Sequence, residues 1–156
     1  LSVFESGAIM LYLAEKHGAF LGAPEDRSVM LEWLMWQMSG QGPAIGQVHQ
    51  FLKYGNRLNE AGEAKWLAER DRLYRVLDAR LAECPFVAGD TYTIVDMAVW
   101  PWVSRFDWHQ VDLNDYPNVA AWYVKLAERP AVQAGYHQPK FVNDMRLLPR
   151  ADPHRH

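Results

Sequence analysis

The sequence predicts an all-α fold, a bundle of helices. Apolar residues recur at helical spacing from residue 27 to about 39 and again from 61 to 83, whereas no segment shows a convincing strand pattern. Glycine and proline fall between these segments, where helices end. Hydrophobic residues occupy 49% of the 156 positions, which is enough for one buried core in a chain of this length.

The first predicted helix opens the chain. Positions 8 to 14 are nearly all apolar, so we expect this helix to be covered on most of its sides. Gly18 marks its end. Glu5 and Ser6 stand at its start, with Ser6 as the predicted N-cap. Because the first N–H groups of a helix are unpaired and carry partial positive charge, this start offers a site for a carboxylate ligand.

A linker at residues 19–26 leads to a helix that begins at Arg27. We expect residues 40–46 (GQGPAIG) to interrupt this helix, with a kink or a restart at Pro43, because glycine weakens and proline blocks helical hydrogen bonding. The glycines lack the G-x-G-x-x-G spacing of a phosphate loop and follow no strand, so we disfavour phosphate binding.

The segment 61–83 predicts the longest helix. Its outer face mixes acidic and basic residues, which favours a solvated face with its own ion pairs.

Thr93 and Asp96 have the spacing of a capping box before an apolar helix, and we favour this role for Asp96 over a catalytic one. Pro101 predicts a kink in that helix, and Pro117 suits the first turn of another.

Composition narrows the possible partners. The net charge of −3 leaves no basic footprint for nucleic acid. No apolar run is long enough for a bilayer and no signal peptide is visible, so we expect no membrane partner and a cytoplasmic location. The single Cys84 excludes an internal disulfide and is expected to be incidental. His154 and His156 lack the further ligands of a specific metal site, so we expect no metal.

Several motifs together resemble the glutathione transferase family. Residues 4–9 (FESGAI) and 11–16 (LYLAEK) resemble the end of the family's thioredoxin-like domain. The family's helical domain is similar, in the same order, to residues 86–90 (FVAGD), 93–96 (TIVD), 116–119 (YPNV) and 129–132 (RPAV). Because the chain also starts without Met and close to a helix, we expect it to lack most of an N-terminal thioredoxin-like domain.

Three further motifs resemble the bacterial nu class, whose members are glutathione-dependent disulfide reductases: residues 33–37 (WLMWQ), 42–47 (GPAIGQ) and 100–103 (WPWV). The resemblance implies that the complete protein uses a glutathione thiolate in disulfide exchange or conjugation, with a small electrophile or disulfide as the second substrate. The alternative is a non-catalytic binding or assembly module of the same fold.

The resemblance also implies a division of the chain. Residues 1–18 are the C-terminal end of a thioredoxin-like domain, and 19–26 are the linker. Residues 27–136 are an all-helical domain like the C-terminal domain of glutathione transferases, and 137–156 are an irregular tail. The residue that activates the thiol is expected upstream of this chain, so the fragment by itself is expected to be inactive.

The resemblance further implies which residues bind glutathione. Ser6 and its N–H take the carboxylate of the γ-glutamyl end, and Glu5 takes the ammonium. Arg72 matches a nu-class arginine that reaches towards bound glutathione or disulfide; the alternative is that it belongs to the solvated face of its helix.

Two sets of aromatic and apolar residues have open alternatives. Phe51, Tyr54 and Trp108 are candidates for the wall of the second-substrate site, although ordinary packing is the favoured explanation. Family members form two-fold dimers, which implies a homodimer with the first two helices near the interface. Trp33, Trp36 and Met38 are candidates for that interface, and core burial is the alternative.

Overall fold

The computed structural model describes residues 1–55, 59–141, 143–146 and 148, and within them the predicted all-α fold is confirmed. The helices, in chain order, are α1 (Ser6–His17), η1 (Pro24–Asp26), α2 (Arg27–Trp36), η2 (Gln37–Gln41), α3 (Gly42–Leu52), α4 (Glu60–Glu83), α5 (Ile94–Val103), η3 (Leu113–Asp115), α6 (Pro117–Ala127) and α7 (Pro130–Tyr136). Of these, η1 and η3 are 3₁₀ turns and η2 is a π turn. None of the helices described is long and apolar enough to cross a membrane.

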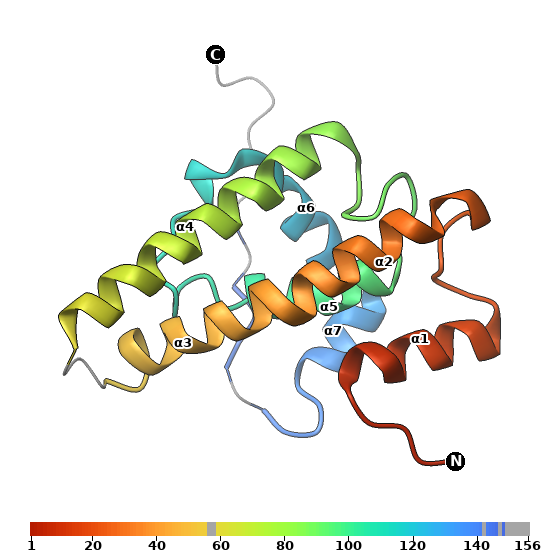
Figure 1. The fold of residues 1–156 in the computed structure, drawn as a ribbon, viewed down its shortest axis with the longest axis horizontal. Coiled ribbons are helices and arrows are strands. Elements are labelled where there is room, and N and C mark those ends of the chain that lie inside the picture. The colour runs from red at the N-terminus through yellow and green to blue at the C-terminus, as the bar shows by residue number, and fades with distance from the viewer. Residues whose placement is uncertain (56–58, 142, 147, 149–156) are drawn as a thin grey trace.

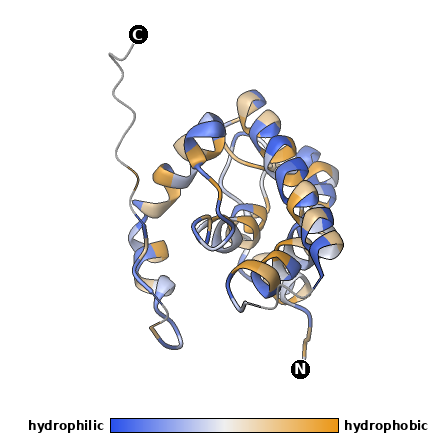
Figure 2. Ribbon diagram, turned by 90° about the vertical axis from the view of Figure 1, so that its left-hand side faces the viewer, coloured by the Kyte–Doolittle hydropathy of each residue, from blue (hydrophilic) through white to orange (hydrophobic). Residues whose placement is uncertain are grey.

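Two long helical stretches form the frame of the bundle. α2, η2 and α3 follow one another almost without a break, and α4 runs beside them (Figure 1). α3 and α6 pack against α4, α5 packs against α2 and η2, and α1 packs against α5. Hydrophilic and hydrophobic residues both occur on the helices of the bundle (Figure 2), although α5 is almost entirely apolar. Helices of this kind bury their apolar sides against one another.

The core centres on α5. Most of its residues are buried: Ile94, Val95, Asp96, Ala98, Val99, Trp100 and Val103. Trp100 stacks on Tyr123 of α6 with ring centroids 5.3 Å apart, and its Nε1 donates a 3.2 Å hydrogen bond to the Tyr123 carbonyl. α5 is therefore the helix around which the others pack, as its nearly continuous apolar sequence favours.

The capping box predicted at the start of α5 is confirmed. The Val95 N–H donates to Thr93 Oγ1 at 3.2 Å, and the Thr93 N–H donates to Asp96 Oδ2 at 2.9 Å. Asp96 thus has the structural role that its spacing predicts.

The interruption predicted at residues 40–46 is confirmed in part, because it begins three residues earlier than predicted. The α-helical pattern is broken earlier, by the π turn at Gln37–Gln41, and no loop follows. α3 begins at Gly42 with Pro43 in its first turn, so the predicted restart at Pro43 is confirmed. The first turn of a helix tolerates proline because its N–H groups need no intrahelical acceptor.

The prediction that α1 is covered on most of its sides is also wrong. Only Gly7 and Ala14 of α1 are buried, whereas Ile9, Tyr12 and Leu13 keep 38%, 38% and 46% of their surface exposed. One side of α1 packs against α5, and no element in the described part of the chain covers the opposite side.

Candidate functional site

The candidate site is the N-terminal end of α1. Glu5, which precedes the helix, has φ 69° and ψ 121°. This backbone conformation is unfavourable for any residue with a Cβ and costs about 1–3 kcal/mol. Strain of this size persists where the surrounding structure enforces it, and it is concentrated at ligand-binding sites.

The backbone N–H groups at this end of α1 are open. The Ile9 N–H donates to the Glu5 carbonyl at 2.9 Å, so the N–H groups of residues 6 to 8 precede the hydrogen-bond ladder of the helix. No side chain of the described residues caps this end. The prediction that Ser6 is the N-cap is therefore wrong: the strained Glu5 occupies the cap position, and Ser6 is already helical.

The π turn packs against the start of α1. The sulfur atom of Met38, the second residue of that turn, lies 3.7 Å from Ser6 Oγ. A Cβ on Gly7 would come within 3.2 Å of Met38 Cγ and Sδ, so the small size of glycine lets α1 and the Met38 side chain approach closely here. The start of α1 is therefore in direct contact with the Met38 side chain of the π turn.

The arrangement suits a ligand that carries both charges of an amino acid. Three open N–H groups and the positive end of the helix dipole stabilise an anion, typically by about 0.3–1 kcal/mol for the dipole. The exposed carboxylate of Glu5 stands directly before them, where it can accept hydrogen bonds from an ammonium group. The helix start therefore offers partners for both a carboxylate and an ammonium group.

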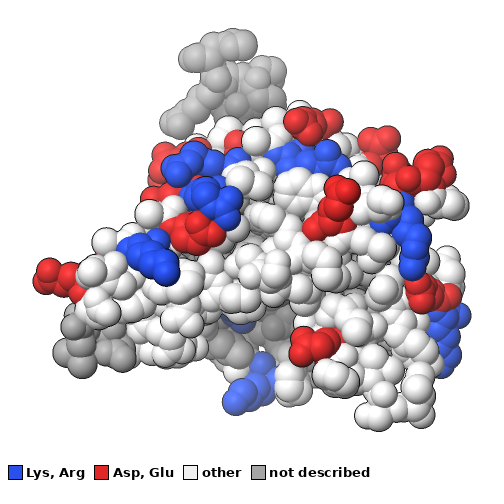
Figure 3. Space-filling view, viewed as in Figure 1, with Lys and Arg blue, Asp and Glu red and all other residues white. Residues whose placement is uncertain are grey.

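Arg72 lies on a different helix from Glu5 and Ser6. It belongs to α4, and α2 runs between α4 and α1 (Figure 1). Its guanidinium donates to both carboxylate oxygens of Glu69 at 2.7 and 2.8 Å, and its side chain is 53% exposed. Charges of both signs lie close together along α4 (Figure 3). These contacts agree with a solvated, self-paired face, and a contact of Arg72 with glutathione stays a prediction.

The three aromatic candidates for the second-substrate wall have different surroundings. Phe51 is half-buried against the start of α4, where a Cβ on Gly62 would meet its ring at 3.2 Å. Tyr54 is 63% exposed. Trp108 is half-buried, with Lys53 Nζ 4.6 Å from its ring centroid. Of the three, Tyr54 presents the most free surface to a second substrate.

The apolar residues predicted for a dimer interface are only partly exposed. Trp33 and Trp36 are half-buried and meet edge to face, with ring centroids 5.2 Å apart. Met38 is half-buried and contacts α1. Their neighbour Met35 keeps 52% of its surface exposed, so this part of α2 does carry an apolar surface.

Neither the Cys84 thiol nor the described His, Asp and Glu side chains form a second reactive or metal-binding site. Burial raises the pKa of the Cys84 thiol, which disfavours a thiolate. The thiol donates a hydrogen bond to the Phe86 carbonyl oxygen at 3.0 Å. Among the described residues, no three His, Cys, Asp or Glu side chains lie close enough to hold a metal ion. His154 and His156 lie outside the described residues.

One buried polar cluster has no counterpart among the sequence predictions. His109 lies within hydrogen-bonding distance of both His49 and Tyr74, which come from α3 and α4. These residues are 60 and 35 positions from His109 along the chain. No periodicity or local motif signals contacts over such separations.

Comparison with known proteins identifies the domain. Residues 44–130 match the family model of the glutathione S-transferase C-terminal domain. The chain is 43% identical over 132 residues to the disulfide-bond oxidoreductase YfcG of Escherichia coli strain K12, across 84% of this chain and 61% of YfcG. It is 41% identical over 146 residues to the disulfide-bond oxidoreductase YghU of the same strain, across 86% of this chain and 50% of YghU.

Solved structures agree with these relatives. The chain superposes with a TM-score of 0.81 and 35% identity on a glutathione transferase from Burkholderia graminis with two glutathione molecules bound per subunit, across 90% of this chain and 62% of that one. A glutathione transferase from Pseudomonas putida, with one glutathione disulfide bound per subunit, gives a TM-score of 0.81 and 36% identity across 89% of this chain and 64% of that one. The chain therefore spans between half and two thirds of the length of these relatives.

The family resemblance carried by the motifs is thus confirmed by three independent comparisons, over a helical bundle whose order of elements the structure shows. The chain belongs to the glutathione S-transferase family and contains its C-terminal domain.

Proposed function

We propose that this chain is part of a glutathione-dependent disulfide oxidoreductase, and that the start of α1 binds the γ-glutamyl end of glutathione. The observation that carries the proposal is the pairing of the strained, exposed Glu5 with the open N–H groups of residues 6 to 8. The γ-glutamyl group has an α-carboxylate and an α-ammonium on one carbon, which is the combination this helix start suits. Relatives described as disulfide-bond oxidoreductases, and neighbours with bound glutathione, support the choice of ligand.

The proposed reaction is thiol–disulfide exchange by the complete protein. A glutathione thiolate attacks one sulfur of a disulfide substrate, forms a mixed disulfide, and releases the other sulfur as a thiolate. A second glutathione thiolate then attacks the mixed disulfide, giving glutathione disulfide and the second substrate thiolate. Conjugation of glutathione to a small electrophile would begin from the same thiolate.

We place residues 1–18 at the C-terminal end of a thioredoxin-like domain and residues 27–136 in the helical domain, with 19–26 as the linker. The exposed apolar side of α1 supports this division, since Ile9, Tyr12 and Leu13 would be covered by the rest of such a domain. The group that activates the thiol would then lie upstream of Leu1. We place the complete protein in the cytoplasm.

A homodimer of the complete protein is part of the proposal. The face over α2 and α3 carries few charged residues compared with α4 (Figure 3). Met35 of α2 is an exposed apolar residue. Uncharged surface with Trp and Met residues is typical of subunit interfaces.

The test is a substitution of Glu5 in the complete protein. Glu5→Gln removes the charge that faces the ammonium, so we expect the Kd for glutathione, measured by calorimetry, to rise about tenfold, the effect of losing one charge-assisted hydrogen bond. Glu15→Gln is the matched control: Glu15 is also exposed on α1 but is paired with Arg27 at 2.7 Å, and its loss should leave the Kd unchanged. An unchanged Kd in Glu5→Gln would instead favour a non-catalytic assembly module.

A further inference from the structure

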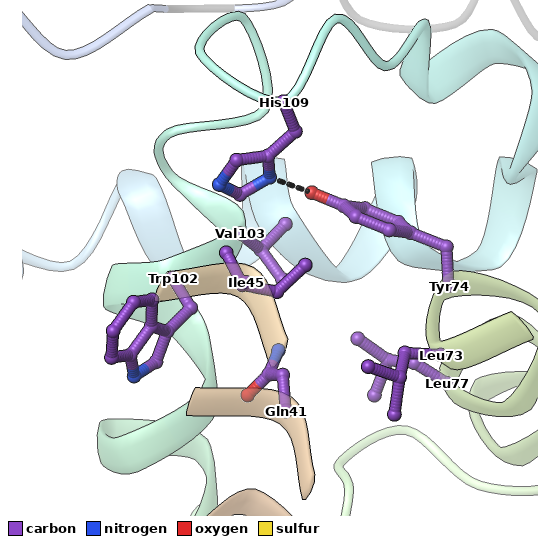
Figure 4. Close-up of a pocket in the computed structure, with 8 residues that line it drawn as sticks. All are labelled: Gln41, Ile45, Leu73, Tyr74, Leu77, Trp102, Val103 and His109. Carbon is purple, nitrogen blue, oxygen red and sulfur yellow. Dashed lines mark hydrogen bonds between the residues drawn. The ribbon is translucent and has the colours of Figure 1, made fainter. Parts of the chain in front are cut away.

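A chain of three hydrogen-bonding side chains joins three separate elements. Nε2 of His49 on α3 lies 2.9 Å from Nε2 of His109, which is in the turn that follows α5. Nδ1 of His109 lies 2.8 Å from the hydroxyl oxygen of Tyr74 on α4 (Figure 4). His109 and Tyr74 are buried, at 0% and 4% exposure, and His49 is half-buried. Both ring nitrogens of His109 thus have a hydrogen-bond partner inside the core.

Only one arrangement of protons satisfies this chain when it is neutral. The 2.9 Å gap between the two Nε2 atoms has room for a single hydrogen, so one histidine donates and the other accepts. The hydroxyl of Tyr74 has His109 Nδ1 as its acceptor among the described residues. Tyr74 therefore donates to Nδ1, the Nε2–H of His109 donates to His49, and His49 carries its own hydrogen on Nδ1.

An additional proton disrupts this arrangement. A proton on Nε2 of His49 would face the Nε2–H of His109 across the same 2.9 Å gap. If His109 instead moved its hydrogen to Nδ1, the Tyr74 hydroxyl would lose its acceptor inside the core, which is costly. A charged histidine in this chain therefore breaks the contact between the two imidazoles or leaves a buried donor unpaired.

The surrounding charges oppose protonation too. Lys53 and Arg105 lie over the Trp108 ring, and that ring meets the His49 ring with centroids 5.4 Å apart. On α4, Arg70 Nη1 donates to the His109 carbonyl at 2.6 Å. The other titratable groups that face the chain are Asp71, which pairs with Arg70, Asp107, which pairs with Arg146, and the phenols of Tyr116 and Tyr123.

The effect on stability has a defined sign. Burial and the nearby arginine lower the pKa of His49 below its ordinary value of 6.5, and burial lowers that of His109 further. The unfolded chain, whose histidines titrate near 6.5, therefore binds more protons below that pH than the folded chain does. The stability that these residues contribute is full above pH 6.5 and is lost as the pH falls below it.

We propose that Tyr74, His109 and His49 form a pH-sensitive link, which holds α3, α4 and the turn after α5 together while both histidines are neutral and opens when one of them takes up a proton. The proposal is independent of glutathione binding at α1, because none of its residues lies at the start of that helix.

The test compares thermal unfolding of this full chain at pH 7.5 and pH 5.0. Glutamine places an amide near the position of Nε2 and does not titrate, so His49→Gln keeps the contact with His109 at both pH values. We expect the Tm of the unchanged chain to fall by about 3 °C more than that of His49→Gln, because only the unchanged chain takes up a proton at this position. His17→Gln, at an exposed histidine in the last turn of α1, should follow the unchanged chain. Equal losses of Tm in the unchanged chain and His49→Gln would overturn the proposal.

A second measurement applies even where His49→Gln does not fold. Nitrogen-15 NMR of the imidazoles in the unchanged chain should show that His109 carries its hydrogen on Nε2 and His49 carries its hydrogen on Nδ1. These tautomers should stay the same from pH 8 to pH 6. Independent titration of both rings near pH 6.5 would contradict the link.

Discussion

Asp96 accepts hydrogen bonds from three parts of the chain. The N–H of Thr93 donates to its Oδ2 at 2.9 Å, while the N–H of Val87 and the Nε1–H of Trp122 donate to its Oδ1 at 3.0 and 2.9 Å. The residue is 0% exposed. The capping carboxylate thus connects the loop before α5, α5 itself and α6 through hydrogen bonds. Buried donors of this kind are costly when they lose their acceptor.

We expect Asp96→Asn to lower the free energy of unfolding by about 2 kcal/mol, because one oxygen becomes an amide nitrogen that faces buried donors. Urea denaturation followed by circular dichroism measures this change. Asp90→Asn, at an exposed position of the preceding loop, is the control and should change stability by less than about 0.5 kcal/mol. A loss of that small size in Asp96→Asn would show that the network tolerates an amide.

At the scale of elements, the start of α6 is capped by a residue from α4. Asp78 Oδ1 accepts hydrogen bonds from the N–H groups of Asn118 and Val119 at 2.8 and 3.0 Å, and its Oδ2 accepts from Asn118 Nδ2 at 3.0 Å. Tyr116, at the cap position itself, makes no capping hydrogen bond with its side chain. The packing of α6 on α4 and the capping of α6 therefore depend on the same carboxylate.

We expect Asp78→Ala to cost about 1–2 kcal/mol, the usual loss for a helix cap, and to increase hydrogen exchange at the first amides of α6. Hydrogen-exchange mass spectrometry resolves this region. Glu83→Ala removes another carboxylate of α4, one that is 70% exposed and pairs with Arg80 at 3.3 Å, and it should leave α6 unaffected. Equal protection of α6 in both variants would mean that Asp78 is dispensable as a cap.

At the scale of the whole molecule, one face of α1 is left open. Besides the apolar side chains of Ile9, Tyr12 and Leu13, an apolar hollow of about 270 Å³ lies between α1 and α5, lined in part by Met10 and Met97. Glu5 and Ser6 stand at one end of the same helix. In the proposed binding mode, Glu5, Ser6 and the open N–H groups contact the γ-glutamyl end of glutathione, so none of them is left to lower the pKa of its thiol.

We therefore expect a polypeptide of these 156 residues to show negligible disulfide reduction with glutathione, because glutathione bound by its γ-glutamyl end alone is not activated at sulfur. The measurement is a coupled assay of glutathione disulfide formation with a small disulfide substrate, run beside the complete protein. A rate comparable to that of the complete protein would contradict our division of the site.

The sequence by itself determined the helical class, most helix ends, the capping box at Thr93 and Asp96, and the family. These features rest on local signals, namely the spacing of apolar residues, proline and glycine at helix ends, and short motifs. Glu5 and Ser6 as the candidate site also follow from a local signal, since a helix start exposes N–H groups whatever surrounds it.

Only the tertiary structure decided the π turn at Gln37–Gln41, the exposure of α1, the capping of α6 by Asp78 and the chain from Tyr74 to His49. Each depends on contacts between residues far apart in the sequence, or, for the π turn, on a one-residue change of hydrogen-bond register that amino-acid propensities do not distinguish. The separation of Arg72 from the start of α1 has the same cause: periodicity assigns a residue to a helix face, whereas packing decides what that face meets.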